Sequence, residues 1–208
     1  LENALLGYTD LTGATLNYAD LTGATLNYGD LTNAGLGYAD LTNAFISYSI
    51  LTNANFNHAD LTNADLYRAD LTDASLQGAD LTDAELFAAD LTNADLRSAD
   101  LTGATLNYGD LTNADLEYAD LTNAYLEDAT VTNANFDSTT WSNTIWIDGE
   151  IYDSQPLMLM TDCELVPYAY CAGADLSYMD LSGMDLTGID LRGANLQNAN
   201  FDYATLDG

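Results

Sequence analysis

Apolar residues recur at every fifth position along most of this chain, and this period constrains the fold more than any other feature. The register begins at Leu1 and runs to Leu126, and larger apolar residues continue it at Val131, Phe136, Trp141, Trp146 and Ile151. A small residue, most often Ala, stands two positions before each of them. Helices need an apolar spacing near 3.6 and strands a spacing of 2. A period of five therefore predicts a chain that turns at regular intervals, with Leu and Ala inside a narrow interior.

The residues outside the apolar register also repeat. Asn or Gly follows many Leu-Thr pairs, and we expect these residues to form the corners: Gly13, Gly23, Asn33 and Asn43. A second period of ten alternates units that begin with Asp-Leu-Thr and units that end in Tyr. If the coil has four sides, two opposite sides carry columns of Asp and Thr, and the other two carry a varied set with tyrosines. We expect the threonines to contribute strand propensity, with an ordered-water or ice-binding array as the alternative.

At this point the sequence resembles the pentapeptide-repeat family, whose unit appears as Ala19-Asp20-Leu21-Thr22-Gly23. The resemblance covers residues 1 to 150 and 174 to 208. It implies an all-β fold, a right-handed quadrilateral parallel β-helix in which four units make one coil. Each coil then takes about 20 residues and rises by the spacing between strands, about 4.8 Å.

The repeat is interrupted once, which predicts three parts. Residues 1–151 form a pentapeptide-repeat solenoid, residues 152–173 a non-repeat loop or insertion, and residues 174–208 further repeats that continue the solenoid. Cys163 and Cys171 both lie in the interruption. Their spacing allows a disulfide in an oxidising compartment, and two buried free thiols are the alternative.

The charge balance excludes several classes of partner. The chain has 33 acidic residues against three arginines and no lysine. Nucleic acids and anionic membrane surfaces are excluded as partners, because both are bound through Lys and Arg. No apolar run is long enough to insert into a membrane. The chain begins at Leu1 and not at Met, so we expect processing after export. This predicts an extracellular or cell-surface location. The alternatives are the periplasm, the thylakoid lumen and, for a DNA mimic, the cytoplasm.

Stacking of coils predicts columns of carboxylates. One column is a candidate cation ladder: Asp20, Asp40, Asp60, Asp80, Asp100 and Asp120. Carboxylates are the ligands that Ca²⁺ prefers, so Ca²⁺ is the candidate cofactor, and a solvated surface with diffuse counterions is the alternative.

The tyrosines predict aromatic rows on the outside of the coil. The candidate lateral contact residues are Tyr8, Tyr18, Tyr28, Tyr38 and Tyr48. Exposed aromatic rows mark contact surfaces, and stacking along the solenoid is the alternative role. His58 occupies a Tyr position, and we interpret this single histidine as a surface substitution without a site, because a site needs several convergent groups.

No catalytic motif occurs in the sequence, so we predict a protein without enzyme activity. Neither end of the chain shows an obvious polar cap, and the apolar register reaches the ends at Leu1, Leu6, Phe201 and Leu206. Uncapped coils predict head-to-tail association with further copies of the chain into an extracellular filament. The resemblance implies an alternative partner, a DNA-binding enzyme of the type II topoisomerase class bound by DNA mimicry. A monomeric exported scaffold or an ice- or ion-binding solenoid is the third interpretation.

Overall fold

The computed structural model describes residues 1–147, 149, 151–152, 181–189, 191, 196 and 199–206. The chain divides into two compact units, Leu1–Gln155 and Pro156–Gly208, which are described separately. Cys163 and Cys171 lie outside the described residues, as does almost all of the predicted 152–173 insertion. Their predicted disulfide and loop therefore stay predictions.

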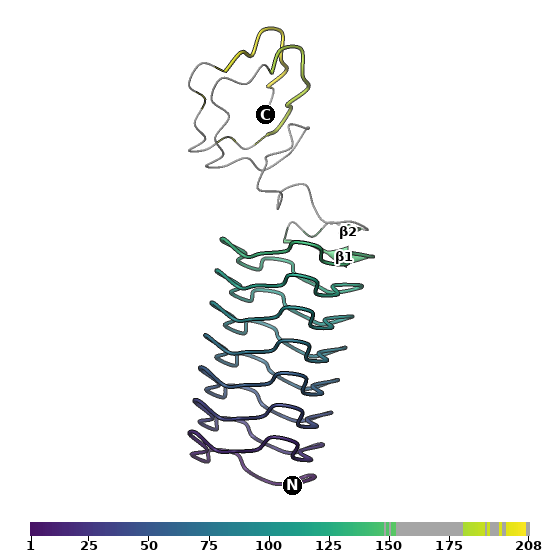
Figure 1. The fold of residues 1–208 in the computed structure, drawn as a ribbon. Helices are drawn as coiled ribbons and strands as arrows, with labels where there is room; N and C mark the ends of the chain where they lie inside the picture. Colours follow the sequence, from purple (N-terminus) through teal and green to yellow (C-terminus); the bar gives the residue numbers. More distant parts are fainter. Residues whose placement is uncertain are drawn as a thin grey trace. The chain divides into compact units, whose positions relative to one another are not determined.

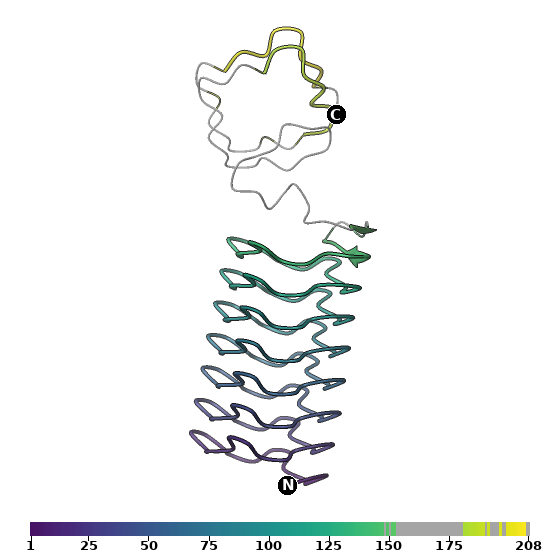
Figure 2. The same cartoon turned by 45° about the vertical axis from the view of Figure 1, so that its right-hand side comes forward.

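The first unit is a stack of similar coils, seen from two directions in Figures 1 and 2. Its parallel bridges join residues 20 positions apart, from Leu5–Thr25 to Tyr125–Ile145, and four bridges occur per coil, one on each side. This arrangement is a right-handed quadrilateral parallel β-helix, which confirms the predicted fold class. The two named strands are β1 (Thr144–Ile145) and β2 (Ile151–Tyr152).

Two kinds of backbone hydrogen bond hold the coils. Between coils, the Leu21 N–H donates to the carbonyl of Asp40 at 2.7 Å, and the Asp40 N–H donates to the carbonyl of Ala19 at 2.9 Å. Within a coil, the Ala24 N–H donates to the carbonyl of Leu21 at 2.9 Å and closes the turn at the corner. Repetition of this pattern satisfies the backbone groups of the interior, which a buried chain requires.

The interior consists of the residues that the period assigned to it. Leu71 is fully buried and Ala74 is 1% exposed, and the other coils from residue 21 to residue 126 repeat this burial. Leu5 lies outside the five-residue register and is 86% exposed. Register, more than hydrophobicity, therefore decides which leucines are buried.

The predicted corner residues adopt the conformation that a sharp turn needs. Gly13 has a φ of 65° and Asn33 a φ of 59°. Gly and Asn tolerate this left-handed region better than other residues. The prediction that these residues form the corners is confirmed.

An aromatic cluster ends the regular stacking in the first unit. The rings of Trp141 and Trp146 lie 5.1 Å apart, and the ring of Phe136 lies 5.3 Å from that of Trp146. Here β1 pairs in parallel with Tyr125 of the coil before it and antiparallel with β2, with Ile145 opposite Ile151. β2 therefore covers the strand edge that β1 would otherwise expose at this end of the first unit. The absence of a cap at the chain ends, near Leu1 and Leu206, stays a prediction.

The second unit contains the same coil geometry in its described part. The Leu181 N–H donates to the carbonyl of Asn200 at 2.7 Å, and Asp185 forms a parallel bridge with Thr205. Leu181 and Leu186 are fully buried. The repeat therefore resumes after the interruption with the hydrogen-bond pattern of the first unit.

Truncation of an interior leucine tests the role of the register. We expect Leu71→Ala to lower the free energy of unfolding by about 2 to 5 kcal/mol, because it leaves a cavity in a closely packed interior. Leu5→Ala is the matched control, and its effect stays within about 0.5 kcal/mol because Leu5 is exposed. Urea denaturation followed by circular dichroism measures both, and equal effects of the two substitutions would contradict the assigned register.

Candidate functional site

Two columns of aspartates run along opposite sides of the first unit. The predicted ladder from Asp20 to Asp120 exists, because each of its members forms a parallel bridge with the next. A second column is interrupted by Ile50, which bridges Asp30 and Asp70. It contains Asp10, Asp30, Asp70, Asp90 and Asp110. The geometry of both columns is therefore set by the pairing of the coils.

The carboxylates of these columns also shape the corners. Oδ1 of Asp80 accepts a hydrogen bond from the backbone N–H of Thr82 at 2.9 Å, and Asp120 accepts one from Thr122 at 2.9 Å. An aspartate that bonds the backbone two residues later stabilises a turn. The threonines therefore lie at the start of the corners, and the expectation that they contribute strand propensity was wrong. No signal but the repeated Asp-Leu-Thr triplet could have revealed this role.

These hydrogen bonds favour the ionised carboxylates. The Thr32 hydroxyl and backbone N–H donate to Asp30 and hold the pKa of this carboxyl below its usual value. The Thr12 hydroxyl and backbone N–H have the same effect on the pKa of Asp10, and the Thr42 backbone N–H and hydroxyl on that of Asp40. Donors that bind the charged form of an acid lower its pKa. Asp10, Asp30 and Asp40 therefore stay ionised to a lower pH than an ordinary aspartate does.

Within the part of the chain that the structure describes, no three or more His, Cys, Asp and Glu side chains gather closely enough to hold a metal ion. The predicted cation ladder at Asp20 to Asp120 thus exists as a column, and its binding of Ca²⁺ stays a prediction. The described residues also contain no helix with the length and hydropathy of a membrane span.

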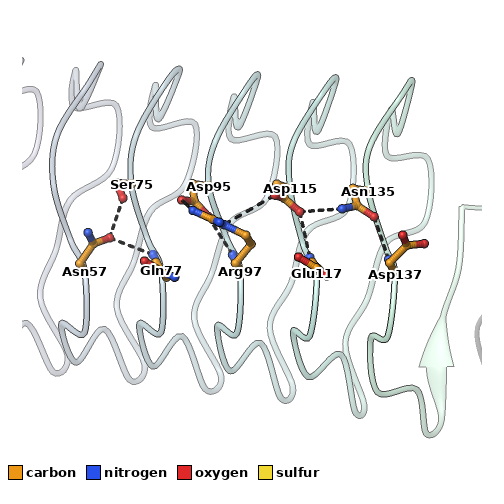
Figure 3. A network of polar contacts seen from close by, with 9 residues as sticks. All are labelled: Asn57, Ser75, Gln77, Asp95, Arg97, Asp115, Glu117, Asn135 and Asp137. Carbon is orange, nitrogen blue, oxygen red and sulfur yellow. Dashed lines mark hydrogen bonds and ion pairs between the residues drawn. The ribbon is translucent and has the colours of Figure 1, made fainter.

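A polar network follows a third side of the coil and contains one of the arginines (Figure 3). Arg97 donates to both carboxylate oxygens of Asp95, at 2.8 and 2.6 Å, and its Nε lies 3.6 Å from Oδ2 of Asp115 in the next coil. Arg97 holds the pKa of Asp95 below its usual value. The guanidinium is therefore used to link neighbouring acidic coils and does not form a basic patch.

The tyrosines form two stacks. The rings of Tyr8, Tyr28 and Tyr48 are nearly parallel, with centroids 4.9 and 5.0 Å apart. On the opposite side Tyr18 and Tyr38 stack at 5.2 Å. The sequence left stacking and surface contact as alternatives; stacking is present, and contact with a partner stays a prediction.

His58 extends the second stack. Its ring centroid lies 4.9 Å from that of Tyr38, with an angle of 27° between the ring planes. The single histidine therefore takes the structural place of a tyrosine, as expected, and has an aromatic neighbour that sequence reasoning did not assign.

The tyrosines occupy the corners, which the sequence analysis did not predict. The φ angles of Tyr8, Tyr18, Tyr28, Tyr38 and Tyr48 lie between 58° and 61°. This left-handed conformation costs a bulky residue about 1–2 kcal/mol, and a stacked aromatic pair contributes about 0.5–1.5 kcal/mol. Stacking therefore offsets part or all of this cost, and the same conformation occurs at equivalent corners without tyrosine, as at Ala88 and Ser98.

The proposed end-contact residues lie in the outermost described coils. Leu1 is 58% exposed and Leu206 is 48% exposed, whereas Leu6 and Phe201 are half-buried. Nothing in the described residues tests whether they contact another copy.

The family model for pentapeptide repeats matches in eight copies, over residues 1–33, 49–86, 79–117, 110–140 and 169–208. The chain belongs to the pentapeptide-repeat family. A search of curated protein sequences found no match for this pentapeptide-repeat protein.

Solved structures of other pentapeptide-repeat proteins are similar to parts or most of the chain. Rfr23 from the cyanobacterium Cyanothece 51142 is 36% identical over 44% of this chain and 63% of its own, with a TM-score of 0.44. HetL from Nostoc sp. strain PCC 7120, a protein involved in heterocyst differentiation regulation, is 29% identical over 95% of this chain and 85% of its own, with a TM-score of 0.34. Trypsin-treated QnrB1, a plasmid-mediated fluoroquinolone resistance protein, is 16% identical over 94% and 90%, with a TM-score of 0.46.

Substitution of Asp80 separates its charge from its hydrogen bond. We expect Asp80→Asn to be at least as stable as the unchanged protein, because the amide oxygen still accepts from Thr82 and repulsion from neighbouring carboxylates falls. Asp80→Ala loses the acceptor and should be less stable than Asp80→Asn by about 1 kcal/mol. Urea midpoints at pH 7 measure the difference. Equal stability of the two variants would show that the turn does not need this acceptor.

The pKa of Glu85 shifts in the opposite direction to those of Asp10, Asp30 and Asp40, so Glu85 contributes to the pH dependence of stability with the opposite sign. Burial and the charge of Asp65 raise the pKa of Glu85. A raised acid pKa means that the ionised form destabilises the folded protein, and that this cost disappears as the pH falls below the unfolded value, about 4.3. We expect Glu85→Gln to raise the melting temperature at pH 7 and to lose this gain below about pH 4. Glu2→Gln, on an exposed residue, is the control, and the same gain there would point to net charge alone.

Proposed function

We propose that this protein is a non-enzymatic scaffold that presents a regular array of negative charge to the basic surface of a DNA-binding protein. The density of charge along the first unit carries the proposal. Residues 1–147 contain 22 acidic residues and two arginines. With 20 residues and about 4.8 Å per coil, this is about one net negative charge per 1.8 Å. Duplex DNA carries about one per 1.7 Å.

The arrangement of the charge supports the same proposal. Duplex DNA presents two charged strands, and the first unit presents two aspartate columns on opposite sides. The hydrogen bonds from threonine backbone N–H groups hold one oxygen of each bonded carboxylate in place, as at Asp60 and Asp100. A preformed array loses less conformational entropy on binding than a flexible acidic tail does. The partner's Lys and Arg residues would displace counterions from these columns, as they do from phosphates.

The partner class that we propose is a type II topoisomerase. Such an enzyme binds a segment of duplex DNA through basic residues, and a rigid polyanion of similar charge spacing would compete for the same surface. This choice rests on the chemistry of the surface and on the family resemblance. Among the similar solved structures, QnrB1 is described as a fluoroquinolone resistance protein.

Supercoiling by DNA gyrase tests the proposal. We expect the protein to inhibit supercoiling in a salt-dependent manner, because the competing contacts are electrostatic. The triple variant Asp60→Asn, Asp80→Asn, Asp100→Asn keeps the three turn acceptors and removes three charges from one column. It should raise the half-inhibitory concentration about tenfold, the scale expected for several lost charge contacts.

A second triple variant is the matched control. Asp65→Asn, Glu85→Gln and Asp115→Asn remove the same number of charges from the other two sides of the coil. We expect it to inhibit nearly as well as the unchanged protein. Equal losses in both triple variants would show that net charge alone acts, and absence of inhibition by the unchanged protein would refute the choice of enzyme.

End-to-end assembly into an extracellular filament stays a prediction. The antiparallel pair β1–β2 occupies the strand edge of the last coil of the first unit, and Phe136, Trp141 and Trp146 fill the interior of that coil. Direct coil-on-coil stacking at that edge is disfavoured by this cover, because the edge of β1 is already paired. The location outside the cell and the binding of Ca²⁺ likewise stay predictions.

A further inference from the structure

A shallow groove of about 350 Å³ crosses three consecutive coils of the first unit. It lies beside the stack of Tyr18, Tyr38 and His58, each of which stands two positions before an aspartate of the Asp20–Asp120 column. Its lining residues are Asn17, Tyr18, Gly37, Tyr38, Asn55, Asn57 and His58. None of these residues carries a carboxylate, although the chain has a net charge of −30.

Two glycines lie beneath the Asn17 amide at the groove. Gly35 and Gly37 lie in the middle coil, where the coils on either side carry larger residues, among them Asn17, Asn55 and Asn57. A Cβ at either glycine would lie 3.2 Å from the Asn17 amide. Neither glycine has a positive φ, so the backbone here does not require glycine. Glycine is therefore used here because the Asn17 amide packs closely against both positions, where a side chain would displace it.

Hydrogen bonds to Oδ1 fix the amide orientation of each asparagine that lines the groove. Oδ1 of Asn17 accepts from the Gly37 N–H at 2.8 Å, and Oδ1 of Asn57 accepts from the Gln77 N–H at 3.0 Å and the Ser75 hydroxyl at 2.6 Å (Figure 3). Oδ1 of Asn55 accepts from the Asn57 N–H at 2.9 Å. Their Nδ2 groups have no acceptor among the described residues. Each amide thus keeps two N–H donors for a ligand.

Two exposed tyrosines form the aromatic side of the groove. Tyr18 and Tyr38 adopt φ angles of 61° and 58°, at corners where Asn or Gly would avoid the strain. The same left-handed conformation recurs at equivalent corners of other coils, as at Arg68 and Ser98, so exposure and not backbone geometry distinguishes the two tyrosines. The ring edges and hydroxyl groups of the two tyrosines supply apolar area and polar tips beside the amide donors.

We propose that this groove binds a neutral oligosaccharide. Fixed amide donors match the hydroxyl and ring oxygens of a sugar, and tyrosine edges match its C–H surfaces. An anionic ligand would be repelled by the surrounding carboxylates, and a cationic ligand would find no carboxylate in the lining. The groove reaches across three coils, which suits a short chain of sugars better than a single one. The lining contains no residue of the aspartate columns, so its test is independent of the gyrase experiment.

Ligand-detected saturation-transfer NMR, followed by calorimetry, tests the proposal with defined probes. These are the neutral hexasaccharides of α-1,4-glucose, β-1,4-glucose and β-1,4-N-acetylglucosamine, with hexagalacturonate as the anionic probe. We expect at least one neutral probe to bind and hexagalacturonate not to bind. Binding of hexagalacturonate more tightly than every neutral probe, or binding of no neutral probe, would overturn the proposal.

Isosteric variants locate the site. Asn17→Asp keeps the Oδ1 that accepts from Gly37 and loses the Nδ2 donors, and we expect it to weaken binding about tenfold, as for one good polar contact. Asn27→Asp is the matched control, because Oδ1 of Asn27 accepts from the Ser47 N–H at 2.8 Å in the same way outside the groove. Equal weakening by both variants would show that added charge is the cause and would overturn the site.

Filling the groove provides a second, independent variant. Gly37→Asn continues the asparagine column between Asn17 and Asn57 and should abolish binding. Gly13→Asn is its control, because a Cβ at Gly13 meets nothing within 4 Å and its φ of 65° suits asparagine. Circular dichroism and melting temperature verify that both variants fold. Unchanged affinity in a folded Gly37→Asn protein would overturn the placement of the sugar.

Discussion

Packing of leucine against alanine in the interior positions every other group of the first unit. In the coils between residues 21 and 126, four large apolar residues and a set of small ones per coil are almost completely removed from water. Each buried leucine contributes roughly 1.5–3 kcal/mol. Repulsion between neighbouring carboxylates in a column is about 0.9 kcal/mol per pair at about 4.8 Å in water. The interior therefore outweighs the repulsion, and the outer positions are free to carry a charge that most folds could not tolerate.

The five-residue period made the architecture predictable, because register alone assigns each residue to the interior, a side or a corner. Counting in fives and twenties also predicted that Asp20 and Asp40 are neighbours in adjacent coils and that Asn33 lies at a corner. The structure confirms both predictions. Leu5 shows why composition could not have done this. It is as apolar as Leu6, yet it lies one position outside the register and is exposed.

Other features depended on interactions that a periodic pattern does not encode. The left-handed tyrosines were missed because propensity assigns such corners to Asn and Gly, and only the spacing of the coils shows that the rings can stack. The hydrogen bonds from Thr82 to Asp80 and its equivalents were missed because the strand propensity of threonine suggested another role. The pairing of β1 with β2 arises where the repeat changes composition, and repeat register gives no information about an antiparallel return. The groove depends on Gly35 and Gly37, whose role appears only beside the asparagines of adjacent coils.

A solenoid can differentiate its sides because each column varies independently of the interior. The side that contains Gly35 and Asn55 is uncharged in its early coils and acquires Asp95, Arg97 and Asp115 in its later ones. Had this side been selected only for solubility, the acidic residues could have continued without cost to the core. Its early coils instead keep two glycines, amides with fixed orientation and exposed tyrosines. An uncharged side between columns of carboxylates favours recognition of a ligand that carries no charge.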